Sequence, residues 1–276
     1  MTKKTKVKVE LTRRDFLTVV GASLASVVAA QFLTTGPLSP FSKLKQKQLE
    51  GAPETGHGAA TGPFHWGMVI NLDTCIGCEY CLRSCSAVND VAVSKPWNIV
   101  VEEKNSAGNT FYFSRPCLHC QNAPCVEVCP VRATYHRDDG LVVMDYDRCI
   151  GCRYCQVACP YDARTFNWAK RADINPYVPT YGTPEVERRP RGVVEKCTFC
   201  IHRIDKALNS GKMPGEDPEA SPACVSICPV GARVFGNLND PESSISKMLA
   251  ENPTFRLRED LGAEPSVYYI PPKEGL

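Results

Sequence analysis

The chain has 276 residues, of which 43% are hydrophobic, 22% are charged and sixteen are cysteine. This length suits one large globular domain or two small ones. The formal charge of +2 arises at the N-terminus, because residues 1–30 hold six basic and two acidic side chains and the remainder carries −2. No net basic surface is left for a nucleic acid, so we expect no nucleic-acid partner.

The N-terminal 33 residues have the pattern of an export signal. Residues 2–15 are basic and residues 16–42 carry no charge. Arg13 and Arg14, followed by Asp15-Phe16-Leu17, resemble the twin-arginine signal, although Thr18 stands where that motif often has lysine. We therefore predict a twin-arginine signal at residues 1–33 and a location at the periplasmic or outer face of the cytoplasmic membrane. An uncleaved anchor helix is the alternative.

A linker follows the signal. Residues 34–63 are rich in glycine, proline, alanine, threonine and lysine and show no periodicity. That composition is typical of an extended connecting segment without a hydrophobic core of its own.

Two similar units of the chain combine a short apolar segment with four cysteines. Residues 68–73 and 142–147 are predicted to be strands, and each leads into a Cys-Ile-Gly-Cys loop and then a helix. We expect Gly77 and Gly151 to adopt positive φ, and Ile76 and Ile150 to shield a bound group from water. The cysteines of these first and third quartets are Cys75, Cys78, Cys81 and Cys85, and Cys149, Cys152, Cys155 and Cys159.

The second and fourth quartets form another internal repeat. Their last cysteines begin the similar segments Cys129-Pro130-Val131 and Cys228-Pro229-Val230. The fourth quartet contains 23 residues between Cys200 and Cys224, which we interpret as a surface insertion. Only Cys85 among the closing cysteines lacks a following proline, since Ser86 replaces it. The cysteines concerned are Cys117, Cys120, Cys125 and Cys129, and Cys197, Cys200, Cys224 and Cys228.

The remaining pattern predicts hairpins, one long loop and a helical end. Residues 97–103 and 110–114 alternate as strands, and residues 137–140 form a second hairpin turn. Residues 171–192 contain four prolines and form an irregular loop; we interpret the Arg-Arg-Pro-Arg run at 188–191 as solvated or as facing an acidic partner. A helix is expected at 242–250. The tail at 267–272 is expected to lie across a partner.

The spacing of the cysteines points to iron–sulfur chemistry. The third quartet has the spacing C-x2-C-x2-C-x3-C-P that bacterial ferredoxins use for cluster ligation. Three thiolates on one tight loop reach three corners of a cluster, and the fourth is carried toward a second cluster. A disulfide framework is typical of short secreted chains, and structural zinc uses two separated Cys-x2-Cys pairs. A zinc-stabilised, non-redox interaction module is nevertheless kept as an alternative from another functional class.

Residues 64–272, with four quartets in this order and the long gap in the last, resemble the four-cluster iron–sulfur subunit of the dimethyl sulfoxide reductase superfamily. The resemblance implies an α+β fold of tandem bacterial-ferredoxin-like modules with a pseudo-two-fold repeat, each binding two 4Fe–4S clusters, plus long loops and an extended C-terminal tail. The implied outer module spans 64–116 and 160–240, and the inner module spans 117–159. Residues 241–276 then form a helix and a partner-docking tail.

The resemblance also implies that quartets exchange their last cysteines, so that four ligand sets hold four 4Fe–4S clusters. Set 1 is Cys75, Cys78, Cys81 and Cys228, and set 2 is Cys197, Cys200, Cys224 and Cys85. Set 3 is Cys117, Cys120, Cys125 and Cys159, and set 4 is Cys149, Cys152, Cys155 and Cys129.

The function implied is electron transfer within a hetero-oligomer. One partner is a molybdopterin-type catalytic subunit, and the other is a quinone-reactive membrane subunit or a cytochrome. The exported subunit of a hydrogenase or of a sulfur-metabolism complex is the alternative. We find no catalytic constellation in the chain itself. We interpret His119 and His202 either as hydrogen-bond donors to sulfur or as packed loop side chains. Lys196 and Arg115 either raise the potential of a nearby cluster or are surface charges.

Overall fold

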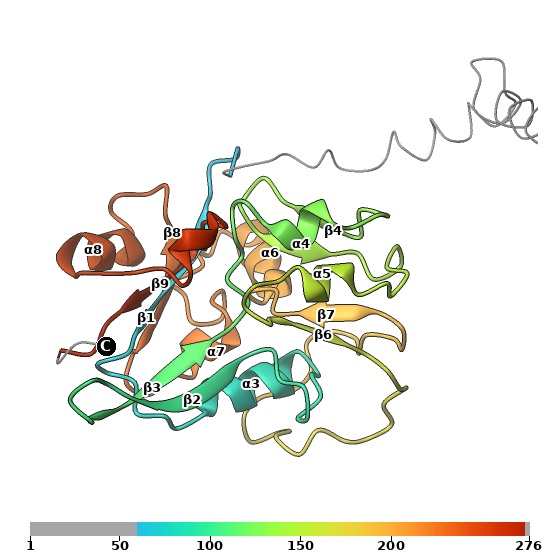
Figure 1. The fold of residues 1–276 in the computed structure, drawn as a ribbon, viewed down its shortest axis with the longest axis horizontal. Coiled ribbons are helices and arrows are strands. Elements are labelled where there is room, and N and C mark those ends of the chain that lie inside the picture. The colour runs from blue at the N-terminus through green and yellow to red at the C-terminus, as the bar shows by residue number, and fades with distance from the viewer. Residues whose placement is uncertain (1–59, 274–276) are drawn as a thin grey trace, which may run out of the picture. The chain divides into compact units, whose positions relative to one another are not determined.

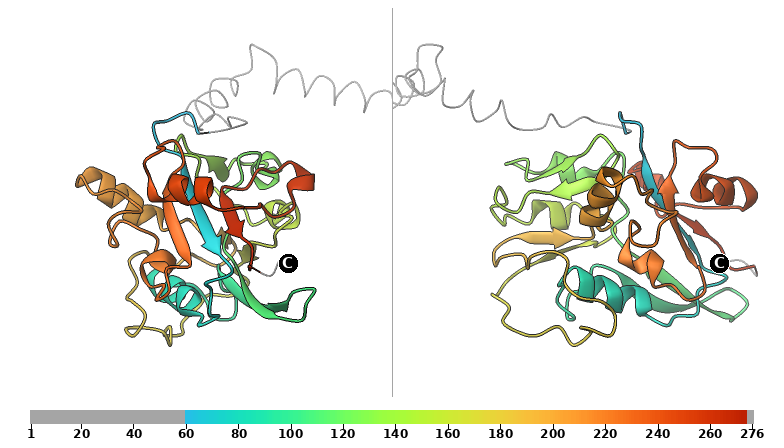
Figure 2. Two further views of the ribbon diagram at one scale, coloured as in Figure 1. Left: turned by 90° about the vertical axis from the view of Figure 1, so that its left-hand side faces the viewer. Right: turned by 180° about the vertical axis from the view of Figure 1, so that it is seen from behind.

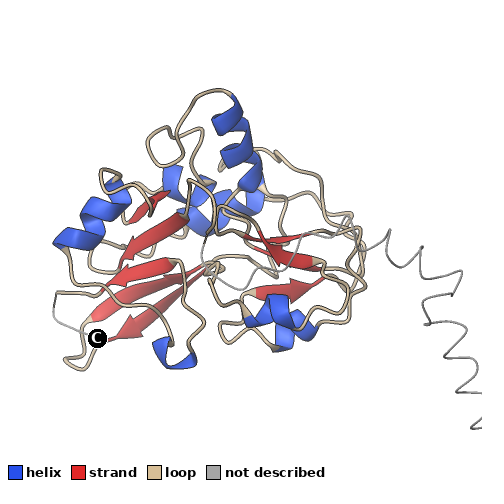
Figure 3. Cartoon of the chain, turned by 90° about the horizontal axis from the view of Figure 1, so that it is seen from above, coloured by secondary structure: helices blue, strands red, loops and turns tan. Residues whose placement is uncertain are grey.

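The computed structural model describes residues 60–273. The predicted signal at 1–33 and the linker up to residue 59 lie outside the described residues. The described chain mixes short helices with four small sheets, in agreement with the α+β prediction. In Figure 1, β1, β8, β9 and α8 lie on one side, and β4, β6, β7, α4 and α5 lie on the other. Figure 3 shows the same two groups of strands from above.

The largest sheet has three strands in the order β8-β1-β9. The central strand β1 (Trp66–Asn71) is antiparallel to β8 (Arg233–Asn237) and parallel to β9 (Val267–Ile270), and Figure 2 shows it between them from two further sides. Side chains alternate along a strand. Met68 and Ile70 therefore enter the main hydrophobic core, whereas Val69 contacts the cluster around Ile245 on the other face.

The C-terminal segment differs from the prediction. Residues 267–270 pair with β1 of the same chain through the register Met68↔Val267 to Asn71↔Ile270. Tyr269 is fully buried and stacks on Phe113 at 4.9 Å between ring centroids. These four residues thus lie in the chain's own sheet rather than across a partner, because their apolar side chains complete its core.

Three antiparallel hairpins complete the strands. They are β2 (Ile99–Lys104) with β3 (Thr110–Arg115), β4 (Thr134–His136) with β5 (Val142–Met144), and β6 (Arg164–Phe166) with β7 (Val194–Lys196). The first two were predicted from alternation and turn residues. The third escaped prediction because residues 167–193 separate its strands and no local turn signal connects them.

The helices are short. They are α3 (Tyr80–Val88), α4 (Pro124–Glu127), α5 (Tyr154–Val157), α6 (Ile201–Asn209), α7 (Ala223–Ser226), α8 (Ser244–Glu251) and the 3₁₀ helix η1 (Glu259–Leu261). α3 and α5 begin directly after the Cys-Ile-Gly-Cys loops, and α8 begins within two residues of its predicted start, after the N-cap Ser243. None of the helices within residues 60–273 has the length and apolarity needed to cross a bilayer.

The long loop at 171–192 contains no helix or strand, as predicted, and Arg191 is exposed, but Arg188 and Arg189 pair with acidic side chains of this chain. The Arg188 guanidinium pairs with Asp90 at 2.7 Å, and Arg189 pairs with Glu195 at 2.8 Å. The side chains of this second pair are only 5% and 3% exposed. Arg188 and Arg189 therefore hold the loop against the rest of this chain. The interpretation of a solvated or partner-facing run is wrong for these two residues.

Candidate metal centres

The two Cys-Ile-Gly-Cys loops have the same backbone conformation. Gly77 and Gly151 have φ of 68° and 70°, as predicted, and the residues two positions later, Glu79 and Arg153, have φ of 61° and 65°. A Cβ at Gly77 would collide with the Tyr112 ring, and one at Gly151 would collide with the Gly192 carbonyl. Both glycines are thus required by their left-handed conformation and by close packing.

The sulfurs of set 1 meet around one cavity. Cys75, Cys78 and Cys81 line it together with Cys228, which comes from the other end of the chain. Burial raises the pKa of Cys75, and the thiolates of Cys81 and Cys228 raise it further against the opposing hydrogen bond from the Gly77 amide. Ile76 also lines this cavity but is 56% exposed, so the expected shielding of the site from water is only partial.

Set 2 lies deeper in the protein. Burial raises the pKa of Cys85 well above its ordinary value, and the neighbouring thiolates of Cys197, Cys200 and Cys224 add to this effect. The Ala223 amide donates to Cys200 Sγ at 3.5 Å, and Asn89 Nδ2 donates to the same sulfur at 3.5 Å. Such N–H donors stabilise negative charge on a ligating sulfur.

The sulfurs of set 3 also lie within electrostatic reach of one another. Burial raises the pKa of Cys120, and the thiolates of Cys117, Cys125 and Cys159 raise it further. Cys159 comes from the third quartet, whereas the other three come from the second.

Set 4, like set 1, is partly exposed. Burial raises the pKa of Cys155, with contributions from Cys125 and Cys129 against the opposing charge of Arg164. Cys149 and Cys152 precede Cys155 on the same loop and are partly exposed. The Ala133 amide donates to Cys129 Sγ at 3.2 Å.

Cysteines of different sets also interact electrostatically with one another. Set 1 reaches set 2 through Cys81 and Cys224. Set 2 reaches set 3 through Cys197 and Cys117. Set 3 reaches set 4 through Cys125 and Cys155. Electrostatic interactions thus link the sets in the order 1, 2, 3 and 4.

The donor set fits iron–sulfur clusters. All sixteen cysteines are free of disulfides. Burial raises the pKa of Cys224 to about 12 against the opposing charge of Arg233, and repulsion from Cys200 adds to the rise, so the thiolates need further positive charge. Bound metal supplies that charge and deprotonates its thiol ligands. Within residues 60–273, no three His, Cys, Asp or Glu side chains are arranged to hold a single metal ion. A four-iron cluster needs no such close group, because it binds each thiolate at a different iron.

Two buried arginines adjoin the sulfurs. Arg164 is 1% exposed, and its Nη2 donates to Cys125 Sγ at 3.0 Å. Arg233 is 4% exposed and interacts with the thiolates of Cys81 and Cys224. Neither was predicted from the sequence, although each lies five residues after a quartet-closing cysteine, in the segments Cys159-Pro-Tyr-Asp-Ala-Arg and Cys228-Pro-Val-Gly-Ala-Arg.

The other side chains singled out in the sequence have different surroundings. Lys196 is fully buried, so the surface-charge interpretation is wrong for it, whereas Arg115 is partly exposed. His119 is buried and stacks on Phe199 at 4.0 Å, and its Nδ1 accepts from the Val142 amide at 3.2 Å. These contacts pack the ring, but its Nε2 is buried without a hydrogen-bond partner among the described residues, so donation from His119 to a cluster sulfur stays a prediction. Burial, with the charge of Lys196, lowers its pKa well below the ordinary value and keeps it neutral.

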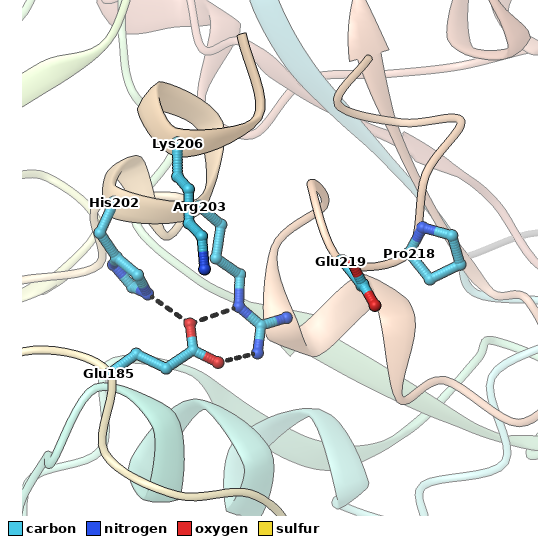
Figure 4. A pocket seen from close by; sticks show the side chains of 6 residues that line it. All are labelled: Glu185, His202, Arg203, Lys206, Pro218 and Glu219. Atoms are coloured by element: carbon cyan, nitrogen blue, oxygen red, sulfur yellow. Dashed lines mark hydrogen bonds and ion pairs between the residues drawn. The ribbon is translucent and has the colours of Figure 1, made fainter. Parts of the chain in front are cut away.

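His202 belongs to a polar pocket beside α6. Its Nε2 lies 2.9 Å from the Glu185 carboxylate, which also accepts from Arg203 Nε at 2.8 Å. Figure 4 shows Glu185 between these two side chains, with Lys206 and Glu219 lining the same pocket. Because Glu185 lies in the loop at 171–192, this pairing ties the loop to α6, and it gives His202 a structural role.

Comparisons with known proteins agree with this donor chemistry. Two family models described as the 4Fe-4S dicluster domain match the chain, one at residues 108–175 and one at 148–232. The second quartet lies in the first match, the fourth in the second, and the third in both. The chain therefore carries tandem 4Fe–4S dicluster domains.

Relatives that cover most of the chain define the family more closely. A Halobacterium salinarum protein assigned as an iron-sulfur subunit of dimethyl sulfoxide reductase is 45% identical over 75% of this chain and 79% of its own length. The menaquinone reductase iron-sulfur cluster-binding subunit of Nitratidesulfovibrio vulgaris is 42% identical over 76% and 89%. The Hdr-like menaquinol oxidoreductase iron-sulfur subunit 1 of Archaeoglobus fulgidus is 35% identical over 94% and 97%. The chain belongs to this family of iron–sulfur subunits of reductase complexes.

Proposed function

We propose that this chain holds four 4Fe–4S clusters in sets 1 to 4 and relays single electrons along them. The observation that carries the proposal is that successive sets interact electrostatically, through Cys81 and Cys224, Cys197 and Cys117, and Cys125 and Cys155. Bound clusters supply one-electron transfer at potentials between about −700 and +450 mV. The protein's own residues hold the thiolates, donate N–H bonds to sulfur and exclude water from sets 2 and 3.

The exchange of cysteines between quartets belongs to the same proposal. Burial together with the thiolates of Cys197, Cys200 and Cys224 dominates the pKa of Cys85, although Cys85 belongs to the first quartet. Two modules follow from the exchange, one holding sets 1 and 2 and the other holding sets 3 and 4, related by the pseudo-two-fold repeat. The electrostatic interaction between Cys197 and Cys117 links one module to the other.

The partners we propose are a molybdopterin-type catalytic subunit and a quinone-reactive membrane subunit or cytochrome. The family supports the first, since one relative is assigned to a dimethyl sulfoxide reductase. The words menaquinone and menaquinol in the names of two other relatives support the second. Assembly on the outer face of the cytoplasmic membrane follows from the twin-arginine signal predicted at residues 1–33.

Metal analysis of the anaerobically purified protein tests the cofactor. We expect about sixteen irons per chain, from four four-iron clusters with matching sulfide, and a brown protein whose reduced form gives electron paramagnetic resonance signals. Zinc with little sulfide and no colour would refute electron transfer in favour of the zinc-stabilised module.

Two serine variants in one quartet test the exchange. Cys159→Ser should damage the set 3 cluster, and Cys155→Ser should damage the set 4 cluster, although the two cysteines are only four residues apart. Redox titration with electron paramagnetic resonance distinguishes the signals. Damage to the same cluster in both variants would contradict the exchange while leaving electron transfer intact.

Export is tested separately. The double variant Arg13→Lys and Arg14→Lys should leave folded, cluster-containing protein in the cytoplasm, because twin-arginine export depends on that pair. Fractionation of cells measures the outcome, and unchanged export of the variant would contradict the assignment.

A further inference from the structure

Three cations are buried in the described core without a carboxylate partner. Arg164 is 1% exposed, Arg233 is 4% exposed and Lys196 is fully buried. Within residues 60–273, none of the three forms a salt bridge with an Asp or Glu side chain. A buried charge is costly unless an opposite charge compensates it. Cysteine thiolates are the negative groups that act most strongly on Arg164 and Arg233.

Arg164 lies at the junction of sets 3 and 4. Its Nη2 donates to Cys125 Sγ at 3.0 Å and to Thr134 Oγ1 at 2.9 Å, and its Nη1 lies 3.1 Å from Met144 Sδ. Burial alone would lower the pKa of Arg164, but the thiolates of Cys125, Cys155 and Cys117 outweigh it and raise the pKa above the ordinary value. Cys125 and Cys155 are also the residues through which set 3 meets set 4.

Arg233 occupies the corresponding position between sets 1 and 2. Its Nη2 donates to Asn98 Oδ1 at 2.9 Å and to Ser114 Oγ, and its Nη1 lies 3.6 Å from Met68 Sδ. Burial alone would lower its pKa, but thiolates led by Cys81 and Cys224 raise it. The surroundings of the two arginines are therefore alike: each lies against a hydroxyl group, a methionine sulfur and two neighbouring cysteine sets of its own.

Lys196 lies where set 2 meets set 3. Its Nζ donates to the Cys197 carbonyl at 2.8 Å and to the Val142 carbonyl. The thiolate of Cys197 interacts with Cys117 across this junction and with the charge of Lys196. The same charge acts on His119, which lies between two cysteines of set 3. Apart from cysteine sulfurs, the hydrogen-bond partners of the three cations are neutral oxygens and methionine sulfurs, so the only charges that offset the cations there belong to the cysteine sets.

We propose that Arg233, Lys196 and Arg164 each supply a fixed positive charge at one junction of the electron path and thereby raise the reduction potentials of the two clusters that flank it. This inference rests on the proposed function. Adding an electron makes a cluster more negative, so a nearby buried cation stabilises its reduced form. The expected pattern is pairwise: Arg233 acts on sets 1 and 2, Lys196 on sets 2 and 3, and Arg164 on sets 3 and 4.

The test is a redox titration, followed by electron paramagnetic resonance, of the full chain in its purified complex. Arg164→Met removes the charge and keeps an apolar stem. It should lower the equilibrium constants for reducing the clusters of sets 3 and 4 at least about tenfold, which corresponds to about 59 mV for one electron. The reduction potential of the set 1 cluster should stay unchanged. Arg164→Lys keeps the charge and should restore most of the shift.

Arg132→Met is the matched control. Arg132 is exposed and lies three residues after Cys129 of set 4, so water and salt screen its charge and the potentials should change by less than about twofold in equilibrium constant. Iron and sulfide content is measured on every variant. Arg233→Met and Arg233→Lys repeat the comparison for sets 1 and 2.

The outcomes separate this inference from the function on which it rests. Wild-type protein without clusters would refute the proposed function. Full clusters in Arg164→Met with unchanged potentials, or an equal shift of all four clusters, would refute only the role of the cation. If Arg164→Met loses iron, the comparison of Arg233→Met with Arg233→Lys decides whether the buried cation raises the potentials. Loss of iron from both methionine variants would assign the arginines to folding and overturn the proposal.

Discussion

Replacement of Arg189 by methionine should loosen the long loop at 171–192. The Arg189 guanidinium donates to Glu195 at 2.8 Å, to the Asn89 carbonyl at 2.5 Å and to the Asp90 carbonyl at 2.9 Å. It also lies 4.7 Å from the centre of the Trp97 ring. Arg189→Met retains apolar contact with Trp97 but leaves the Glu195 carboxylate, 3% exposed, without its cation.

The size of the effect follows from that buried carboxylate. Removing one partner of a buried ion pair costs about 3–5 kcal/mol, because the remaining charge is uncompensated. Since about 1.4 kcal/mol corresponds to a factor of ten, the open population of the loop should rise roughly 100-fold to several thousand-fold.

Hydrogen exchange of the loop amides measures this population. The Gly192 amide donates to the Asn167 carbonyl at 2.8 Å at the base of the loop, so its exchange should accelerate by that factor. Leu72, whose amide donates to Ile270 in the three-stranded sheet, should keep its rate.

The control lies in the same arginine run. Arg191 is exposed, so Arg191→Met should change stability by less than about 0.5 kcal/mol. The double variant Arg189→Met with Glu195→Gln should recover part of the loss because no buried charge remains. Acceleration of Gly192 by less than tenfold, or equal effects of Arg189→Met and Arg191→Met, would refute the reasoning.

Three further predictions concern the loops, the sheet and the sulfurs. Gly151→Ala should abolish the set 4 cluster signal, because its Cβ would collide with the Gly192 carbonyl; Gly231→Ala, at φ 63° with open space around it, should cost only about 1–2 kcal/mol and keep all clusters. Tyr269→Ala should cost about 3–5 kcal/mol by opening a cavity, whereas Tyr269→Phe loses only the hydrogen bond to the Ser114 carbonyl, about 1 kcal/mol. Thermal denaturation compares the two, and similar melting temperatures would argue against core packing of β9. Asn89→Leu should lower the potential of the set 2 cluster alone by removing N–H donors to Cys200 and Cys85; a redox titration showing no shift would contradict this role.

The sequence by itself determined the local units of this protein. The Cys-Ile-Gly-Cys loops, the positive φ of Gly77 and Gly151, the β2–β3 and β4–β5 hairpins and α8 follow from residues adjacent in the chain. Turn geometry, alternation and capping act over a few residues, so they can be recognised without a tertiary structure. The cysteine spacing likewise predicted the donor chemistry, because one tight loop fixes which sulfurs reach a common centre.

The tertiary structure decided which distant residues meet. Whether residues 267–270 join a sheet or a partner depends on the open edge of β1, and the pairing of β6 with β7 spans a loop without a local signal. Charged side chains show the same limit, since nothing in the sequence around Lys196 and Arg189 indicates that they are buried. Their surroundings are built from elements far apart in the chain, and burial and electrostatic compensation arise only when those elements pack.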